Sequence, residues 1–216
     1  MGFDKTFASL GGKPVALHSI AAFEATDCVD QIIVVARQER IEDLREVVAQ
    51  QMFRKVARVV PGGMHRQDSV SAGLAALGPE CDWVAVHDAA RPLIQPVQIE
   101  GAFHAAQKNG AAAVAAPVTD TLKRAKEDGT VSEAIDRTGV YAMQTPQIFA
   151  RDLLLEAFAF VQANQLSITD EVSALQHLGR AVVLVPNEDL NFKITFPADL
   201  ALAEFVLQER ARTAGS

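Results

Sequence analysis

The sequence predicts an α/β fold with a mostly parallel, doubly wound sheet of the Rossmann-like kind. Short apolar runs recur along the chain without polar alternation, which is typical of strands that are covered on both faces. Amphipathic stretches of helical length separate these runs, and such alternation builds a parallel sheet. The chain has 216 residues, enough for one such domain, so we expect residues 1–216 to form a single domain.

Composition and charge limit the functional class. The chain carries 20 Lys and Arg against 27 Asp and Glu, a net charge of −7, which argues against nucleic acid or an anionic membrane as a partner. The two cysteines, Cys28 and Cys81, form no metal-binding spacing and fit a reduced, cytoplasmic protein. No apolar run is long enough to span a membrane, and we expect no signal peptide. An anionic substrate would therefore need a local basic pocket.

The first quarter of the chain begins the predicted alternation. Residues 1–7 do not read as a strand, and they carry a basic group, Lys5. The predicted elements that follow are a helix opened by Gly11-Gly12-Lys13-Pro14, a strand at residues 31–36, a charged helix at about 38–50 and a strand at 57–60.

A glycine pair follows the strand at 57–60. Gly62 and Gly63 lead through Arg66 to Ser69, after which we expect a helix through about Leu77. A strand, a glycine pair and a helix start let backbone N–H groups approach a phosphate or a base. A tight turn alone would also explain the glycines. The hydroxyl and guanidinium donors that follow favour a binding loop.

The central predicted strand, at residues 83–86, ends in His87-Asp88-Ala89-Ala90-Arg91-Pro92. In open α/β sheets, ligands bind beyond the carboxyl ends of strands. Asp88 could hold a divalent metal there, and Arg91 could bind a phosphate. The alternative is an Asp88–Arg91 ion pair that closes a surface turn.

The next part of the chain contains a segment of different character. A helix at 96–108 and a buried strand at 111–116 come first. Residues 117–124 and 131–137 are polar and loosely alternating, with a turn between them, and predict a β-hairpin that leaves the body. Because a hairpin without its own core is marginal in water, we expect a partner subunit to cover it. Residues 117–143 would then be a dimerisation arm.

The last part of the chain returns to the body through Gln144-Thr145-Pro146-Gln147. The predicted elements are a helix at 151–163, a helix start at 167–171, a strand at 181–185, an extended piece at 191–194 and a final helix from Pro197 to about Arg210. Thr169 is the expected N-cap of the second helix, with two acids in its first turn, and capping alone would explain that pattern.

Several of these segments together resemble one family, the 2-C-methyl-D-erythritol 4-phosphate cytidylyltransferases of non-mevalonate isoprenoid synthesis. The matching segments run the length of the chain in the family's order: Lys5 in DKTF, Gly62-Gly63 with Arg66 and Asp68-Ser69-Val70, the segment 87–92, the segment 117–123, Asp136-Arg137, Thr145-Pro146-Gln147, Thr169-Asp170-Glu171 and Lys193-Ile194-Thr195. The family's N-terminal strand and glycine-rich loop have no counterpart in the sequence, where Met1-Gly2 resembles the residues just after that loop.

The resemblance implies transfer of a cytidylyl group from CTP to 2-C-methyl-D-erythritol 4-phosphate, giving 4-diphosphocytidyl-2-C-methyl-D-erythritol and pyrophosphate. It also implies Mg²⁺ and a homodimer in which the hairpin reaches the other subunit. The implied catalytic lysines are Lys5, on the triphosphate, and Lys193, near the reacting phosphates. The implied CTP-binding residues are Gly62, Gly63, Ser69, Asp88 and Ala89, with Asp88 also on the metal. The implied acceptor-binding residues are Arg91, Thr121, Arg137 and Thr169.

The implied chemistry needs no general base. A phosphate monoester is largely a dianion at pH 7, so it can attack without losing a proton, and the obstacle is repulsion between two anions. We therefore interpret His87 as structural. Two alternatives remain: a cytidylyltransferase that acts on ribitol 5-phosphate, and a catalytically weak nucleotide-binding homologue, because the glycine-rich loop is absent. A nicotinamide dehydrogenase is disfavoured, because no G-x-G-x-x-G follows a strand.

Overall fold

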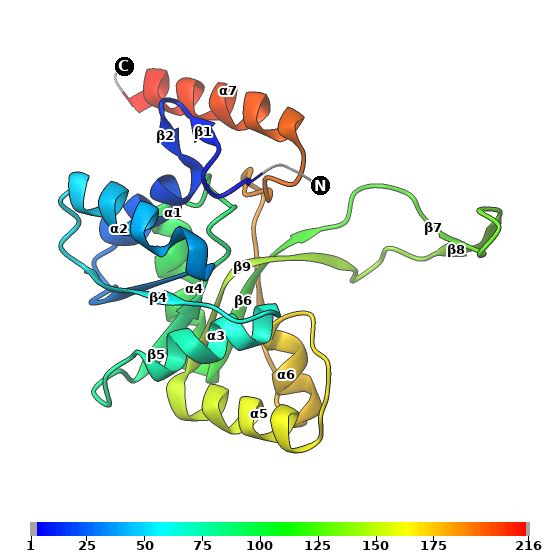
Figure 1. The fold of residues 1–216 in the computed structure, drawn as a ribbon. Helices are drawn as coiled ribbons and strands as arrows, with labels where there is room; N and C mark the ends of the chain where they lie inside the picture. The colour runs from blue at the N-terminus through cyan, green and yellow to red at the C-terminus, as the bar shows by residue number, and fades with distance from the viewer. Residues whose placement is uncertain (1–3, 215–216) are drawn as a thin grey trace.

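Strands and helices alternate along most of the chain in the computed structural model, which describes residues 4–214 (Figure 1). Met1 and Gly2, which the resemblance places just after the family's loop, lie outside the described residues. The elements are β1 (Ser9–Leu10), β2 (Lys13–Pro14), α1 (Val15–Glu24), β3 (Ile32–Ala36), the 3₁₀ turn η1 (Gln38–Arg40), α2 (Ile41–Gln50), β4 (Val56–Pro61), α3 (Arg66–Ala75), β5 (Trp83–Val86), α4 (Pro96–Asn109), β6 (Ala111–Pro117), β7 (Leu122–Ala125), β8 (Val131–Ile135), β9 (Tyr141–Ala150), α5 (Arg151–Ala163), α6 (Glu171–His177), β10 (Val183–Pro186) and α7 (Pro197–Ala214).

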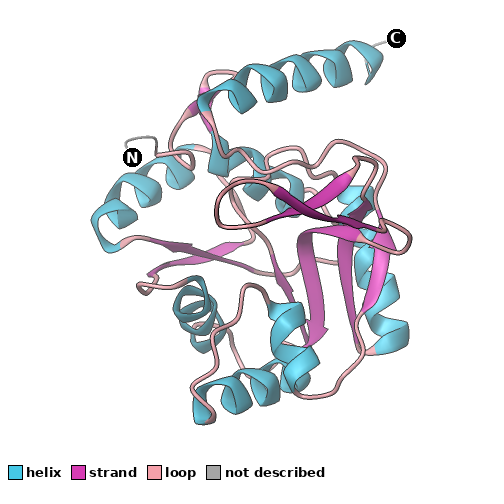
Figure 2. Cartoon of the chain, turned by 90° about the vertical axis from the view of Figure 1, so that its right-hand side faces the viewer, coloured by secondary structure: helices cyan, strands magenta, loops and turns pink. Residues whose placement is uncertain are grey.

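The predicted α/β architecture is confirmed, and the sheets are mixed. The main sheet has the strand order β10-β6-β9-β5, and β3 pairs with β4 beside it (Figure 2). The pairs β10–β6 and β3–β4 are parallel, as the sequence predicts. Strand β9 runs antiparallel to both β5 and β6.

Strand β9 replaces the connecting segment expected at residues 144–147. That segment contains Pro146, which cannot donate to a ladder, and polar residues that are unusual in a buried strand. The β6–β9 pairing shifts register between Ala113 and Ala115, and this irregularity accommodates the proline. The polar side chains of Thr145 and Gln147 are buried because they have hydrogen-bond partners.

Helices cover both faces of the main sheet. Ala102 and Ala106 of α4 pack against Val114 and Ile148 on one face. On the other face, α5 and α6 pack around Phe149 in a separate cluster that includes Leu154 and Leu175. Burial on both sides explains why the alanine-rich run of β6 lacks polar alternation.

The glycine pair Gly11-Gly12 makes a hairpin turn instead of opening a helix. Their φ angles are 55° and 79°, and the flanking strands β1 and β2 pair antiparallel. Two consecutive residues with positive φ are what a two-residue β-hairpin requires. Helix α1 therefore begins only at Val15.

The predicted hairpin arm is confirmed as a structural element. Strands β7 and β8 pair antiparallel and extend away from the body (Figure 1). Most of their residues are exposed, including Val131 at 64%. None of the helices in residues 4–214 is long and apolar enough to cross a membrane.

Candidate active site

Asp88 lies directly after β5 and is surrounded by cations from three segments. Its Oδ2 accepts a 2.8 Å hydrogen bond from Lys193 Nζ, and its Oδ1 lies 3.4 Å from Arg66 Nε. Arg91 Nε is 3.8 Å from Oδ2. Burial acts to raise the pKa of Asp88, but the hydrogen bond from Lys193 and the three positive charges outweigh it and lower the pKa. The site therefore carries an ionised carboxylate within an excess of positive charge.

Lys193 reaches Asp88 because the chain around it is anchored to the body. The next residue, Ile194, is fully buried and donates its backbone N–H to the carbonyl of Ala90 at 2.8 Å. Lys193 itself keeps 37% of its side chain exposed. It is thus fixed at its base and still open to a ligand.

Arg91 ties two segments of the site together. Its Nη1 donates to the carbonyl of Asn191 at 2.8 Å, and its Nη2 donates to that of Met143 at 3.2 Å. The side chain is only 12% exposed, and burial lowers its pKa. This buried bridge differs from the surface ion pair considered as the alternative.

His87 is mostly buried, and its ring nitrogens bond within the protein. Thr145 Oγ1 lies 3.0 Å from Nδ1 and also accepts the backbone N–H of Asp88 at 3.0 Å. Nε2 lies 3.3 Å from the carbonyl of Arg91, so this network assigns the proton to Nε2. Burial lowers the pKa of His87 to about 4. The neutral ring orients the backbone around Asp88, consistent with a structural role.

The glycine pair after β4 packs closely against the first turn of α3. A Cβ on Gly62 would lie 2.5 Å from Ser69 Oγ, and a Cβ on Gly63 would lie 2.2 Å from the Cβ of Asp68. Ser69 Oγ also accepts the N–H of Gly63 at 3.2 Å. Steric contact alone therefore requires glycine here. Helix α3 begins at Arg66, earlier than predicted, so the loop residues and the helix N-terminus form one structure.

Glu171 is a member of this cluster that the sequence pattern did not single out. Its side chain is fully buried, and its Oε1 lies 2.5 Å from Arg66 Nη1. The N-cap of α6 is Asp170, which accepts the N–H of Ser173 at 2.9 Å, so the prediction of Thr169 as cap is wrong. Thr169 instead lies exposed just before the cap. An acid in the first turn of a helix is common, so the pattern gave no sign that Glu171 pairs with Arg66.

The remaining predicted residues lie apart from Asp88. Thr121 and Arg137 are exposed on the arm, where Arg137 donates to the carbonyl of Thr119. Lys5 is half-buried in a turn whose Asp4 pairs with Arg37 at 2.8 Å and with Arg40 at 3.1 Å. Within residues 4–214, no hydrogen bond or ion pair connects Thr121, Arg137 or Lys5 to Asp88.

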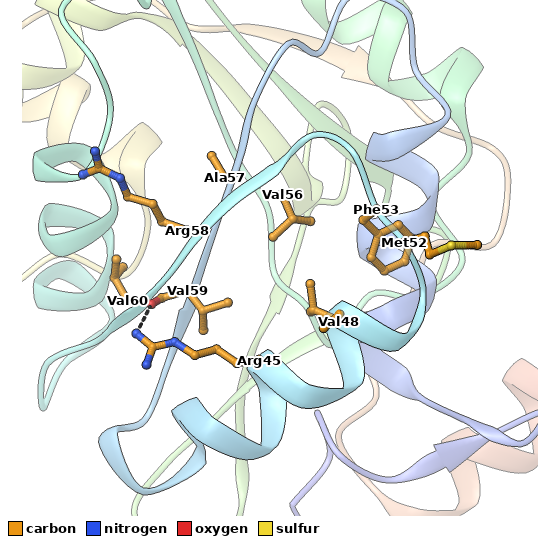
Figure 3. Close-up of a pocket in the computed structure, with 10 residues that line it drawn as sticks. Arg45, Val48, Met52, Phe53, Val56, Ala57, Arg58, Val59 and Val60 are labelled. Carbon is orange, nitrogen blue, oxygen red and sulfur yellow. Dashed lines mark hydrogen bonds between the residues drawn. The ribbon is translucent and has the colours of Figure 1, made fainter.

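A cavity of about 580 Å³ lies elsewhere, between α2 and β4 (Figure 3). Its walls include Val48, Phe53 and Val56, and none of the predicted site residues lines it. Arg45 at its rim donates to the edge carbonyl of Val59 at 3.3 Å. This guanidinium covers part of an unpaired strand edge, a device that blocks further strand pairing.

Comparison with known proteins identifies close relatives of the chain. The family model described as 2-C-methyl-D-erythritol 4-phosphate cytidylyltransferase matches residues 1–209. Curated proteins of that name from Halalkalibacterium halodurans and Acidobacterium capsulatum are 38% and 41% identical to it, over 98% and 96% of this chain and 92% and 88% of theirs.

Solved structures resemble the fold over most of its length. The 4-diphosphocytidyl-2C-methyl-D-erythritol synthase from Anaerococcus prevotii has a TM-score of 0.85 at 28% identity, covering 94% of this chain and 93% of that one. The 2-C-methyl-D-erythritol 4-phosphate cytidylyltransferase from Thermus thermophilus has a TM-score of 0.80 at 32% identity, covering 94% of each chain.

Proposed function

The chain belongs to the 2-C-methyl-D-erythritol 4-phosphate cytidylyltransferase family, and on that premise we propose how its side chains perform the reaction. The enzyme transfers the cytidylyl group of CTP to 2-C-methyl-D-erythritol 4-phosphate, giving 4-diphosphocytidyl-2-C-methyl-D-erythritol and pyrophosphate. The observation that carries the mechanism is the cluster of Asp88 with Lys193, Arg66 and Arg91 at the carboxyl end of β5.

The reaction joins two anions. An oxygen of the acceptor phosphate attacks the α-phosphorus of CTP, the bond from that phosphorus to the β-phosphate breaks, and pyrophosphate leaves with the electron pair. The acceptor is already a dianion at neutral pH, so no side chain has to remove a proton. The buried, neutral His87 agrees with this, because it has no free nitrogen for such a task. Catalysis then depends on positioning and on positive charge.

Lys193 supplies a mobile positive charge at the reacting phosphates. Its ammonium is held by Asp88 and is partly exposed, so it can exchange that partner for an incoming phosphate oxygen. Lys5 supplies a second charge to the triphosphate. A buried carboxylate facing Lys193 keeps the ammonium in place before the substrate arrives.

The cytidine part of CTP binds along Gly62, Gly63, Ser69, Asp88 and Ala89. The two glycines let the loop pack closely against the first turn of α3, and the adjacent N-terminus of α3 favours negative charge. The carbonyl of Ala89 accepts a 3.2 Å hydrogen bond from Ser19, which fixes the backbone at that end of the site.

Asp88 is the residue that would hold Mg²⁺. Magnesium is usually bound by one or two carboxylates together with substrate phosphates, and the described residues contain no cluster of three or more His, Cys, Asp or Glu that would form a complete protein cage. One carboxylate fits that pattern. Bound there, the ion would neutralise negative charge on the triphosphate, and Asp88 would fix the position of the ion.

The acceptor site is completed by a second subunit. Arg91 and Thr169 lie on the body, whereas Thr121 and Arg137 lie on an exposed arm that has no core of its own. A homodimer in which the arm of residues 117–143 covers the other subunit would bring both sets together. We place this homodimer in the cytoplasm, because Cys28 and Cys81 are both free thiols.

The test is pyrophosphate release with CTP and Mg²⁺, measured with 2-C-methyl-D-erythritol 4-phosphate and, separately, with ribitol 5-phosphate. Release with the methylerythritol phosphate alone is the expected result. Release with ribitol 5-phosphate alone would show that the proposed acceptor is wrong. No release with either acceptor would show that the proposed catalytic roles of these residues are wrong. Light scattering of the same sample tests the dimer.

A further inference from the structure

The Arg66–Glu171 pair joins the starts of two helices across the site. Arg66 is the first residue of α3 and Glu171 is the first residue of α6, 105 positions later. Figure 1 shows the start of α6 close to α3, and Leu74 of α3 and Leu175 of α6 belong to one buried cluster. Arg66 also approaches Asp88, so this one side chain contacts both carboxylates.

Burying the Glu171 carboxylate is costly. The side chain is fully buried, its Oε1 is bonded by Arg66, and its Oε2 has no partner among the described residues. Burial raises the pKa of Glu171, and the bond from Arg66 offsets this only in part. A buried carboxylate with only one oxygen hydrogen-bonded is destabilising. Its presence therefore indicates a role that an apolar residue could not fill.

Helix α6 does not need Glu171 to begin where it does. Asp170 already caps the helix through the N–H of Ser173, and Gln147 of β9 accepts the N–H of Val172 at 3.2 Å and donates to Asp170 at 3.0 Å. These bonds anchor the first turn to the main sheet. The remaining effect of the Glu171 carboxylate is on Arg66.

Arg66 lies between two parts of the proposed CTP site, the loop that leads to Ser69 and the carboxylate of Asp88. It is three residues before Ser69 on the first turn of α3, and residues at this spacing lie on the same side of a helix. Its Nε faces Asp88 and its Nη1 is held by Glu171, while Nη2 has no protein partner in residues 4–214. The side chain is 32% exposed. One amino group is therefore available to a ligand at a fixed angle.

We propose that Arg66 binds the phosphates of CTP and that Glu171 is a positioning residue that orients its guanidinium. This rests on the proposed function. Without the Glu171 carboxylate, the guanidinium would turn onto Asp88, its nearest other anion, and both groups would be lost to the nucleotide. Lysine could not replace Arg66, because one ammonium cannot hold this planar, forked arrangement.

The experiment is calorimetric titration of the full-length protein with CTP and no acceptor. Glu171→Gln and Arg66→Gln are each expected to weaken CTP binding about tenfold, the loss typical of one charge-assisted hydrogen bond. If Glu171 acts through Arg66, the double variant binds CTP no more weakly than Arg66→Gln alone. Losses that multiply in the double variant, or unchanged CTP binding in Glu171→Gln, would overturn the proposal.

Two further variants separate positioning from folding. Ser173→Ala removes the hydrogen bond that the Ser173 hydroxyl donates to Asp170 at the start of α6 without touching Arg66, so CTP binding should stay unchanged even if the melting temperature falls. Should Glu171→Gln fail to fold, the partly exposed Arg66→Lys is expected to show the same tenfold loss, and wild-type CTP binding by that variant would refute the idea. Because CTP binding is measured without an acceptor, a wrong acceptor in the proposed function would leave this result standing.

Discussion

The Asp88 cluster and the β7–β8 arm are built in opposite ways. Around Asp88, side chains from α3, α6 and the 191–194 segment hold one another through partly buried hydrogen bonds. On the arm, two exposed strands pair with each other, and the predicted acceptor residues Thr121 and Arg137 project from an element without a core. The proposed nucleotide half of the site, around Asp88, is therefore formed within one chain, whereas the proposed acceptor half depends on what the arm contacts.

The largest expected effect on activity is at the Asp88 cluster. Lys193→Ala should lower turnover by at least about a hundredfold, because it removes a positive charge from the reacting phosphates. The melting temperature should change little, since Lys193 is partly exposed and Ile194 carries the local packing. Steady-state kinetics and thermal melting measure both. Lys108→Ala, on the exposed last turn of α4, is the matched control; near-normal turnover in Lys193→Ala would remove its assigned role.

The two regions should also differ in stability. Leu154→Ala in the fully buried cluster around Phe149 should cost about 3 kcal/mol of unfolding free energy, through lost burial and the cavity left behind. Val131→Ala on the arm, where the side chain is 64% exposed, should cost less than about 0.5 kcal/mol within one subunit. Urea unfolding measures both. A cost at Val131 that grows with protein concentration would instead show that a partner buries this residue.

The sequence predicted the elements that depend on local patterns and missed those that depend on tertiary contacts. Strands β5 and β6 were predicted almost to the residue, because each is an unbroken apolar run of strand length in the sequence, and in β6 this run reflects burial on both faces. Strand β9 was missed because its central residues are polar and include a proline. Gln147 is tolerated in the core because it bonds to Asp170 and Val172, and these are tertiary contacts that no local pattern contains.

The candidate site shows the same division. Motif resemblance pointed to Asp88 and Lys193, and the fold brings these residues, 105 positions apart, to within 2.8 Å. Glu171 has the same separation from Arg66, yet its local sequence looks like ordinary helix capping. Its burial depends on how α6 docks against β9 and α3, so only the structure could identify its partner.

The burial of His87 beside the Asp88 cluster should also make the stability of the protein depend on pH. The pKa of His87 is lowered from 6.5 to about 4 by burial, so between these values the unfolded chain binds a proton that the folded protein excludes. The contribution of the neutral His87 ring to stability is fully present above pH 6.5 and is lost as the pH drops through 4, by about 3 kcal/mol in total. Urea unfolding of the wild type and of His87→Gln across this range measures it. An equal slope in the variant would mean that another group causes the loss.

The smallest expected effect on activity tests the arm. Arg137→Ala should raise the KM for the acceptor about tenfold, as expected for losing one charge-assisted contact to a phosphate, and should leave CTP binding nearly intact. Arg124→Ala is the matched control, because Arg124 is exposed on the same arm and pairs there with Glu133. Mixing Arg137→Ala with Lys193→Ala chains sharpens the comparison. If the arm serves the other subunit's site, mixed dimers contain one site in which both residues are wild type, so activity should recover. Loss of CTP binding in Arg137→Ala, or mixed dimers no more active than either parent, would place Arg137 in the nucleotide half of its own chain.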